Sequence, residues 1–420
     1  MVYFTRQEHV TIGDMLAMNS GLGGLQDIPM VFGMYNTERA YVEALEFSEP
    51  QYLLREQPEY ANINYVILGQ LLESVTGNPW YEFLKERIWK PLGMANTYAS
   101  AHDVPETIRH WLLNDGHFLC GKELIGPLDL LDPGRVKGYN AAGSVVSSPA
   151  DMSKFLRLVL NKGYVGNTTL LQSPSIISEM IQGKVSSSPE VRQMMAKMGL
   201  HYNPDGSTLA AGYGIDIIGQ VCWGHAYYDK SGDVSTHQTR TGFVPQEGLA
   251  VVLLGNSQVP EAHASFYLDH YRSYLLGIFL DVPKHILEFE FRRWRNADIL
   301  TAPVENAPRC GLRFWKDLPT AVLTQEENEA FLGTYTAMTS PQFNPKITIS
   351  NVALGPMYSY RFEAGSVSTT LTYVGHLSSE NSTKLFLGRP ETAIPITILA
   401  TRNGNDGQFT LSIGVDYRKA

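Results

Sequence analysis

The stretch that decides the fold reads Glu59-Tyr60-Ala61-Asn62-Ile63-Asn64-Tyr65-Val66-Ile67-Leu68-Gly69. It opens a predicted helix from about residue 62 to residue 75, because apolar residues recur every fourth position at Ile63, Ile67, Leu71 and Val75. Residues 76–79, Thr-Gly-Asn-Pro, supply the signals that stop a helix. We therefore expect this apolar face to pack in the core, with Tyr60 just before the first turn.

The bulk composition indicates a globular protein and excludes several classes of partner. The 420 residues are 44% hydrophobic and 18% charged, which suits two domains or one large domain with an appendage. A net charge of −9 without clustered Lys and Arg argues against a nucleic-acid surface. Cys120, Cys222 and Cys310 are widely spaced and odd in number, so they predict neither a disulfide framework nor a metal site.

The sequence also gives no sign of membrane insertion or export. No apolar run reaches the roughly 20 residues that a membrane-spanning helix needs. The first six residues lack the charged-then-apolar order of a signal peptide, so we expect a cytoplasmic location.

A second short motif, Lys230-Ser231-Gly232, precedes a predicted strand at residues 249–254 that is apolar throughout. A continuous apolar run of this kind is typical of a strand that is buried on both faces. Taken singly, neither motif is specific, because a Tyr at a helix start is usually a packing residue and Lys-Ser-Gly is common in surface turns. His225 and His237 lie near the second motif, and we interpret them as ordinary strand and loop residues.

Other local patterns place the elements around these motifs. Residues 11–14 have the form of a capping box that opens a short helix. Ser148-Pro149-Ala150-Asp151 opens another helix, which continues to about residue 160. Residues 213–218 alternate in polarity, which predicts a strand.

The composition changes along the chain and predicts two domains. Residues 1–280 mix helical and strand patterns in one domain, and residues 281–323 contain four prolines in a partly helical connector. From 324 to 420, short Thr- and Ser-rich runs separated by Gly, Asn and Pro predict an antiparallel β domain, either a barrel or a sandwich.

The order of these blocks resembles the family of class C β-lactamases, penicillin-binding proteins and related esterases and transesterases. Residues 59–69 resemble its Tyr-x-Asn segment, and residues 230–256 resemble its Lys/His-Thr/Ser-Gly strand, turn and neighbouring strand. Further similar blocks occur in the same order at residues 11–22, 91–94 and 142–151. The resemblance covers roughly residues 9–275. It implies an α/β (α+β) fold, in which a β-lactamase/transpeptidase-like domain with an antiparallel sheet and a helical subdomain precedes the C-terminal β domain.

The resemblance also implies roles for the motif residues. In that family a serine attacks the acyl group, and a Lys one helical turn later takes its proton. Tyr60 would relay a proton to the leaving group, and Lys230 would supply positive charge beside it and help hold a substrate carboxylate or carbonyl. Asn62 would orient that other Lys and an acyl amide of the substrate. The strand with Ser231 and Gly232 would offer a backbone N–H to the oxyanion.

The chain departs from the family pattern in two places. Thr236 stands six residues after Lys230, where relatives usually carry Gly, so the turn and the substrate pocket are expected to differ. No Ser is followed three positions later by Lys, and the ten residues before the first matching block leave no room for that motif. Loss of the serine-bearing segment would expose apolar helix faces. We therefore favour a truncated gene model or isoform over an evolved protein without a nucleophile.

These observations predict a β-lactamase-like serine hydrolase or acyltransferase. We expect an esterase or transesterase, with a setting in secondary metabolism, that acts on a small ester, thioester or amide through an acyl-enzyme. The alternative is a catalytically inactive binding protein that retains the cleft, and the retained Tyr60, Asn62 and Lys230 count against it. No cofactor and no metal are expected, a small-molecule acyl substrate is the predicted partner, and the oligomeric state is left open.

Overall fold

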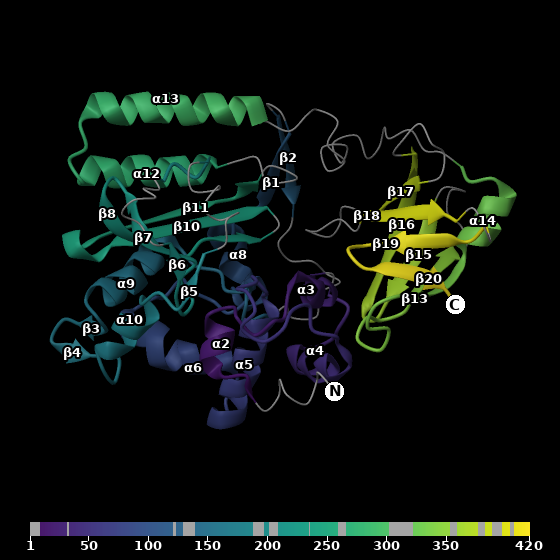
Figure 1. Ribbon diagram of the computed structural model, residues 1–420, viewed down its shortest axis with the longest axis horizontal. Coiled ribbons are helices and arrows are strands. Elements are labelled where there is room, and N and C mark those ends of the chain that lie inside the picture. Colours follow the sequence, from purple (N-terminus) through teal and green to yellow (C-terminus); the bar gives the residue numbers. More distant parts are fainter. Residues whose placement is uncertain are drawn as a thin grey trace.

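The computed structural model describes residues 9–31, 33–120, 123–128, 139–187, 197–200, 209–234, 236–258, 266–301, 322–352, 359–376, 383–388, 397–403 and 407–420. A body of helices and antiparallel sheet lies beside a smaller β-barrel along the long axis of the molecule (Figure 1). The predicted fold class, a β-lactamase-like α/β (α+β) domain followed by an antiparallel β domain, is confirmed.

An antiparallel sheet forms the centre of the larger body. Helix α12 (Tyr267–Phe279) packs on one face of the sheet and α9 (Pro149–Leu160) on the other (Figure 1). The strands run in the order β11-β10-β8-β7-β6-β5, with β9 paired to β10. Their bounds are β5 (Val185–Ser186), β6 (Ala210–Ala211), β7 (Ile217–Cys222), β8 (His225–Asp229), β9 (Gly232–Val234), β10 (His237–Val244) and β11 (Leu249–Gly255).

Three predicted helices are present with the expected caps. The Thr11 hydroxyl accepts from Asp14 N at 3.2 Å and opens α2 (Ile12–Leu16), and the Ser148 hydroxyl opens α9 in the same way. Helix α5 (Ile63–Thr76) ends at Gly77, whose φ of 69° is the left-handed conformation that glycine adopts without strain.

The expectation that the whole apolar stripe of α5 lies in the core is wrong for its C-terminal half. Ile63 is fully buried, whereas Val75 is 76% exposed and Leu71 is 36% exposed. The last turn of the helix therefore extends beyond the packed core. Apolar residues at every fourth position predicted a longer buried face than the helix has.

Two strand predictions also need correction. Residues 213–216 are not a strand, because Gly214 adopts a φ of 72° and Tyr213 N donates to the Met180 carbonyl at 3.0 Å. Strand β7 begins only at Ile217. The apolar strand at 249–254 exists as β11, but its residues are half-buried, because β11 lies at the edge of the sheet in the described part of the chain.

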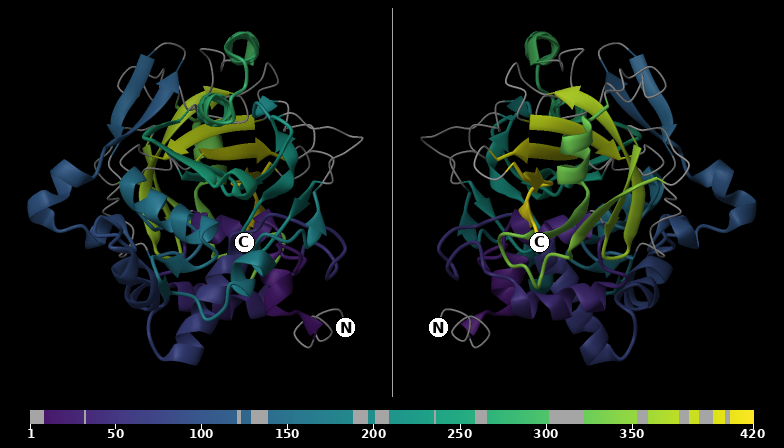
Figure 2. Two further views of the ribbon diagram at one scale, coloured as in Figure 1. Left: turned by 90° about the vertical axis from the view of Figure 1, so that its left-hand side faces the viewer. Right: turned by 90° about the vertical axis from the view of Figure 1, so that its right-hand side faces the viewer.

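The C-terminal body is a closed barrel. Of the two architectures that the sequence left open, the barrel is therefore correct and the sandwich is not. Helix α14 (Gln325–Phe331) packs at the barrel, and its Phe331 stacks on Phe386 with ring centroids 4.2 Å apart. Aromatic side chains therefore fill the interior. Figure 2, right, views this end of the molecule. The strands are β13 (Gly333–Ala337), β14 (Ile347–Asn351), β15 (Ser359–Ala364), β16 (Val367–His376), β17 (Thr383–Gly388), β18 (Thr397–Arg402), β19 (Phe409–Ser412) and β20 (Asp416–Lys419).

The barrel is joined to the larger body through the segment around α3 (Gly24–Val31). Ser366, between β15 and β16, donates its N–H to the Met34 carbonyl at 3.1 Å and its hydroxyl to the Gly33 carbonyl at 2.6 Å. Phe343, between β13 and β14, enters a buried cluster with Tyr41, Ala61, Ile63 and Val66. Part of the barrel thus packs directly against the first turn of α5.

The remaining elements complete the described chain. Helix α13 (Lys284–Thr301) packs along α12 and falls within the predicted connector. No helix among the described residues is long and apolar enough to cross a membrane. The other bounds are α4 (Glu38–Ala44), η1 (Leu45–Phe47), α6 (Trp80–Leu84), the π-helix η2 (Lys85–Trp89), α7 (Lys90–Leu92), η3 (Ala101–Asp103), α8 (Glu106–Leu112), β1 (Gly116–Cys120), β2 (Glu123–Leu128), β3 (Tyr164–Val165), β4 (Thr168–Thr169), α10 (Ser175–Met180), η4 (Pro245–Glu247) and β12 (Ser257–Gln258).

Candidate active site

Tyr60 and Lys230, which are 170 positions apart in the sequence, meet in space. Lys230 Nζ lies 3.2 Å from the Tyr60 hydroxyl and 4.8 Å from the centre of its ring. Tyr60 is 51% exposed, so its hydroxyl is accessible. The structure thus brings together the two residues that the sequence predicted as catalytic.

Asp216 also contacts Lys230, and the sequence did not single out this residue. Its Oδ2 lies 2.9 Å from Lys230 Nζ, and both side chains are 36% exposed. Burial lowers the pKa of Lys230, but the Asp216 carboxylate and the Tyr60 hydroxyl outweigh burial and raise that pKa above its ordinary value. Lys230 is therefore a cation at neutral pH rather than a base. Burial raises the pKa of Asp216, and the charge of Lys230 opposes this shift.

Asn62 is held by a residue from another helix. The Asp27 carboxylate of α3 accepts from Asn62 Nδ2 at 2.9 Å, from Asn62 N at 2.8 Å and from Ile63 N at 2.8 Å. The carboxylate therefore caps the first turn of α5, where no side chain of the helix itself does so. Burial raises the pKa of Asp27, and the N–H groups of Asn62 and Ile63 oppose this shift. The sequence analysis missed Asp27, because nothing local connects residues 27 and 62.

Ser231 points its hydroxyl toward a buried ion cluster rather than toward open space. Ser231 Oγ donates to Asp229 Oδ1 at 2.7 Å and accepts from an Arg272 guanidinium N–H at 2.9 Å. Arg272 is fully buried, and it also pairs with the other oxygen of Asp229. The Thr241 hydroxyl donates to the Lys230 carbonyl, which ties the motif to β10.

The ion cluster continues behind β9 and β10. Arg272 donates to Asp269 at 2.7 Å, and Asp269 accepts from Arg240 Nε at 2.8 Å. Arg240 in turn lies 3.0 Å from Asp233 and donates to the Gly232 carbonyl at 3.3 Å. These contacts fix the backbone of Gly232 and its strand. Asp229 and Asp269 are themselves buried, so each charge depends on its guanidinium partner.

The departure at Thr236 has a clear structural consequence. Thr236 is fully buried, and a β-carbon added to Gly116 would meet its hydroxyl at 1.7 Å. Strand β1 therefore closes over the turn between β9 and β10, where only glycine fits at position 116.

The two histidines near the second motif have ordinary surroundings. His225 Nδ1 lies 3.3 Å from a Glu247 carboxylate oxygen. His237 lies 3.1 Å from the Thr236 hydroxyl and 3.2 Å from the Asn114 carbonyl, and burial lowers its pKa. Among the described residues, no three His, Cys, Asp or Glu side chains are placed to hold a metal ion. Cys222 is a buried free thiol, and Cys310 lies outside the described residues.

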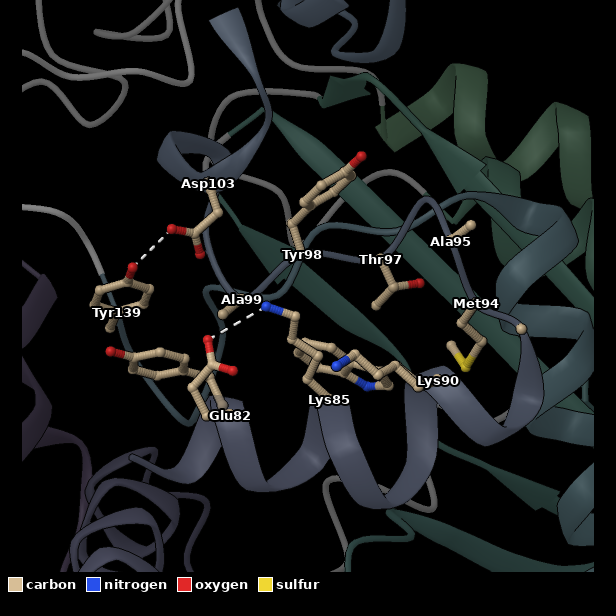
Figure 3. Close-up of a pocket in the computed structure, with 13 residues that line it drawn as sticks. Glu82, Lys85, Lys90, Met94, Ala95, Thr97, Tyr98, Ala99, Asp103 and Tyr139 are labelled. Atoms are coloured by element: carbon tan, nitrogen blue, oxygen red, sulfur yellow. Dashed lines mark hydrogen bonds and ion pairs between the residues drawn. The ribbon is translucent and has the colours of Figure 1, made fainter. Parts of the chain in front are cut away.

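A separate pocket of about 580 Å³ lies between the α6–α7 segment and the loop at residues 94–103 (Figure 3). Tyr81 and Tyr139 stack at one end with ring centroids 4.2 Å apart, and the Tyr139 hydroxyl donates to Asp103 at 2.7 Å. Lys85 lies 3.4 Å from Glu82 at the rim. The described residues that line this pocket include neither Tyr60 nor Lys230, so it is distinct from the candidate active site.

Comparisons with known proteins identify the family of the chain. The family model described as Beta-lactamase matches residues 3–273. An unguisins hydrolase of Aspergillus campestris is 24% identical over 297 residues, which cover 68% of this chain and 49% of that protein. A "Putative D-alanyl-D-alanine carboxypeptidase" of Salmonella gallinarum is 25% identical over 228 residues, which cover 51% of this chain and 49% of that protein. The chain thus spans about half the length of these curated relatives.

Solved structures are similar over larger shares of their own length. The octameric penicillin-binding protein homologue from Pyrococcus abyssi aligns with a TM-score of 0.49 and 17% identity over 96% of this chain and 77% of that one. The D-amino acid amidase from Ochrobactrum anthropi SV3 aligns with a TM-score of 0.46 and 22% identity over 65% of this chain and 79% of that one. Because the family model matches 271 of the 420 residues, the chain belongs to the beta-lactamase family.

Proposed function

We propose that this chain belongs to a serine hydrolase or acyltransferase that works through an acyl-enzyme. The observation that carries the proposal is the 3.2 Å contact between Lys230 Nζ and the Tyr60 hydroxyl, made by two motifs distant in the sequence. A hydroxyl held at this distance from a fixed cation lies where it can pass a proton to or from a reacting group. Tyr60 is the proton relay, and Lys230 is its charge partner.

The other motif residues complete the proposed site. Asn62, oriented by Asp27, presents its amide to the acyl group of the substrate. Strand β9, which begins at Gly232, offers backbone N–H groups to the oxyanion that forms when the acyl group is attacked. Because Lys230 is held as a cation, it stabilises negative charge in the transition state and does not remove the proton of the nucleophile.

The nucleophile is proposed to lie on a segment that precedes residue 1 of this chain. No Ser in the 420 residues is followed three positions later by Lys. Strand β11 supports a preceding segment, because it is apolar along its length and stands at the edge of the described sheet, where a further strand can pair. The acyl donor is a small ester, thioester or amide. Hydrolysis is favoured over transfer, because the curated relatives are named as a hydrolase and carboxypeptidases.

The test has two arms. The coding sequence upstream of residue 1 is read for an in-frame Ser-x-x-Lys, and the extended and the 420-residue proteins are treated with a fluorophosphonate or a penicillin probe. The proposal predicts an adduct on the extended protein alone, and replacement of Tyr60 by Phe slows its formation. If no extension exists and no adduct forms, the alternative function, an inactive binding protein that retains the cleft, replaces this one.

A further inference from the structure

We propose that this site selects substrates whose leaving-group side carries no free carboxylate, such as esters, amides and capped or cyclic peptides. The inference rests on the proposed function and names the substrate class of the same site. It arises because protein carboxylates already occupy the groups that would bind a substrate carboxylate. Those groups are Lys230 and Ser231.

Lys230 has limited capacity for a second anion. Its ammonium group has three N–H donors, of which one points to Asp216 at 2.9 Å and one to the Tyr60 hydroxyl at 3.2 Å. The remaining donor can serve a neutral carbonyl oxygen. A carboxylate bound there would lie close to Asp216, and like charges at such separations repel in a partly buried site.

The hydroxyl of Ser231 is likewise already hydrogen-bonded within the protein. Its hydroxyl proton goes to Asp229 at 2.7 Å, and its oxygen accepts from Arg272 at 2.9 Å. To donate to a substrate, the hydroxyl would have to leave a buried carboxylate with one acceptor bond fewer, which costs free energy. The contact therefore directs Ser231 toward the protein interior.

No other cation of the cluster is available to an anionic ligand. Both guanidinium groups are bound to carboxylates, at 2.8 Å and 3.0 Å for Arg240 and at 2.7 Å for Arg272 with Asp269. Within the described residues, the cluster thus sets three cations against four carboxylates. The cations are Lys230, Arg240 and Arg272, and the carboxylates are Asp216, Asp229, Asp233 and Asp269. The excess is negative, which favours a neutral or cationic leaving group.

The specificity-determining residue in this account is Asp216, because its carboxylate occupies one N–H of Lys230 and its replacement by Asn removes that charge. The test measures binding of N-acetyl-D-alanine and of N-acetyl-D-alaninamide to the chain by NMR titration. The wild-type chain is expected to prefer the amide. In Asp216→Asn the ratio of the two affinities should shift toward the carboxylate by about tenfold, the effect of one charge-assisted hydrogen bond.

Asp233→Asn is the matched control. It removes the same charge from the same cluster, but Asp233 contacts Arg240 rather than Lys230. Its affinity ratio should stay within about twofold of the wild-type ratio, since exposed charges at longer range are screened. The inference is overturned if the wild-type chain prefers the carboxylate, if Asp216→Asn fails to shift the ratio, or if both variants shift it equally. This binding measurement needs no nucleophile. Failure of the acyl-enzyme proposal would instead be seen as the absence of a covalent adduct in the probe experiment, so the two failures can be distinguished.

Discussion

Replacing Asp27 with Ala should loosen the first turn of α5 and release Asn62. The substitution removes the acceptor of three donors, at 2.8 Å from Asn62 N, 2.9 Å from Asn62 Nδ2 and 2.8 Å from Ile63 N. Ile63 is fully buried, so water cannot replace the acceptor of its N–H, and a buried donor without a partner costs about 1–3 kcal/mol. Asn62 is half-buried, and water can satisfy part of its loss.

The free-energy costs at Ile63 and Asn62 are partly offset by a smaller favourable change. Burial raises the pKa of Asp27, so removing this carboxylate recovers some of the free energy that its desolvation costs. We expect a net loss of about 2–3 kcal/mol in local stability, or roughly a 30- to 160-fold increase in amide exchange. Asp27→Asn keeps one oxygen acceptor and should give an intermediate increase.

Hydrogen exchange, detected by mass spectrometry on peptides that cover residues 60–66, measures the local stability of the first turn of α5 directly. Asp151→Ala is the control, because Asp151 is also buried and accepts from Asn96 N at 2.7 Å, from the Thr97 hydroxyl at 3.1 Å and from Lys154 at 2.8 Å. It should leave exchange at residues 60–66 unchanged. The reasoning is refuted if Asp27→Ala exchanges there like the wild type, or if the control accelerates exchange there equally.

Three further predictions concern the support of the site. Arg272→Ala leaves Asp229 buried without its cation and should lower the free energy of unfolding of the larger body by about 3–5 kcal/mol, measured by guanidinium denaturation; a loss under about 1 kcal/mol would contradict it. The hydrogen bond from Arg55 lowers the pKa of Asp14 to about 2, so the stability that this carboxylate contributes is present above about pH 4 and is lost as pH falls toward 2. Asp14→Asn should flatten that dependence between about pH 4 and pH 2 in denaturation curves, and an unchanged slope would count against the assignment. Phe343→Ala should cost about 3–5 kcal/mol and accelerate exchange at residues 60–66 as well as in the barrel, whereas a change confined to residues 338–346 would show that the barrel does not support α5.

The sequence predicted local elements well where the signal is local. The capping box at Thr11, the N-cap at Ser148 and the stop at Gly77 depend on neighbouring residues alone, and each lies where it was expected. The predicted box at Ser148 is only half formed, because the Asp151 carboxylate accepts from Asn96, Thr97 and Lys154 instead of the Ser148 N–H. The alternation at residues 213–216 predicted a strand wrongly, because a left-handed Gly214 and a bond to Met180 overrode it.

The residues of the candidate site also fall into those that a local motif predicts and those that it does not. Tyr60, Asn62 and Lys230 were found because two short motifs occur in a recognisable order. Asp27 and Asp216 were not found, because their partners lie 35 and 14 positions away and no local pattern connects them. The hydrogen bond from the Ser231 hydroxyl to the buried Asp229 was not predicted either.

The central claim is that Tyr60, with Lys230 beside its hydroxyl, is the proton relay of an acyl-transfer site. The most direct test is the rate of acylation of the extended, serine-bearing protein by an activated ester, compared between the wild type and Tyr60→Phe. The account predicts a decrease of about 100-fold or more in kcat/KM with little change in KM, because general acid–base catalysis contributes about that much. A Tyr60→Phe protein that acylates within twofold of the wild-type rate would contradict it.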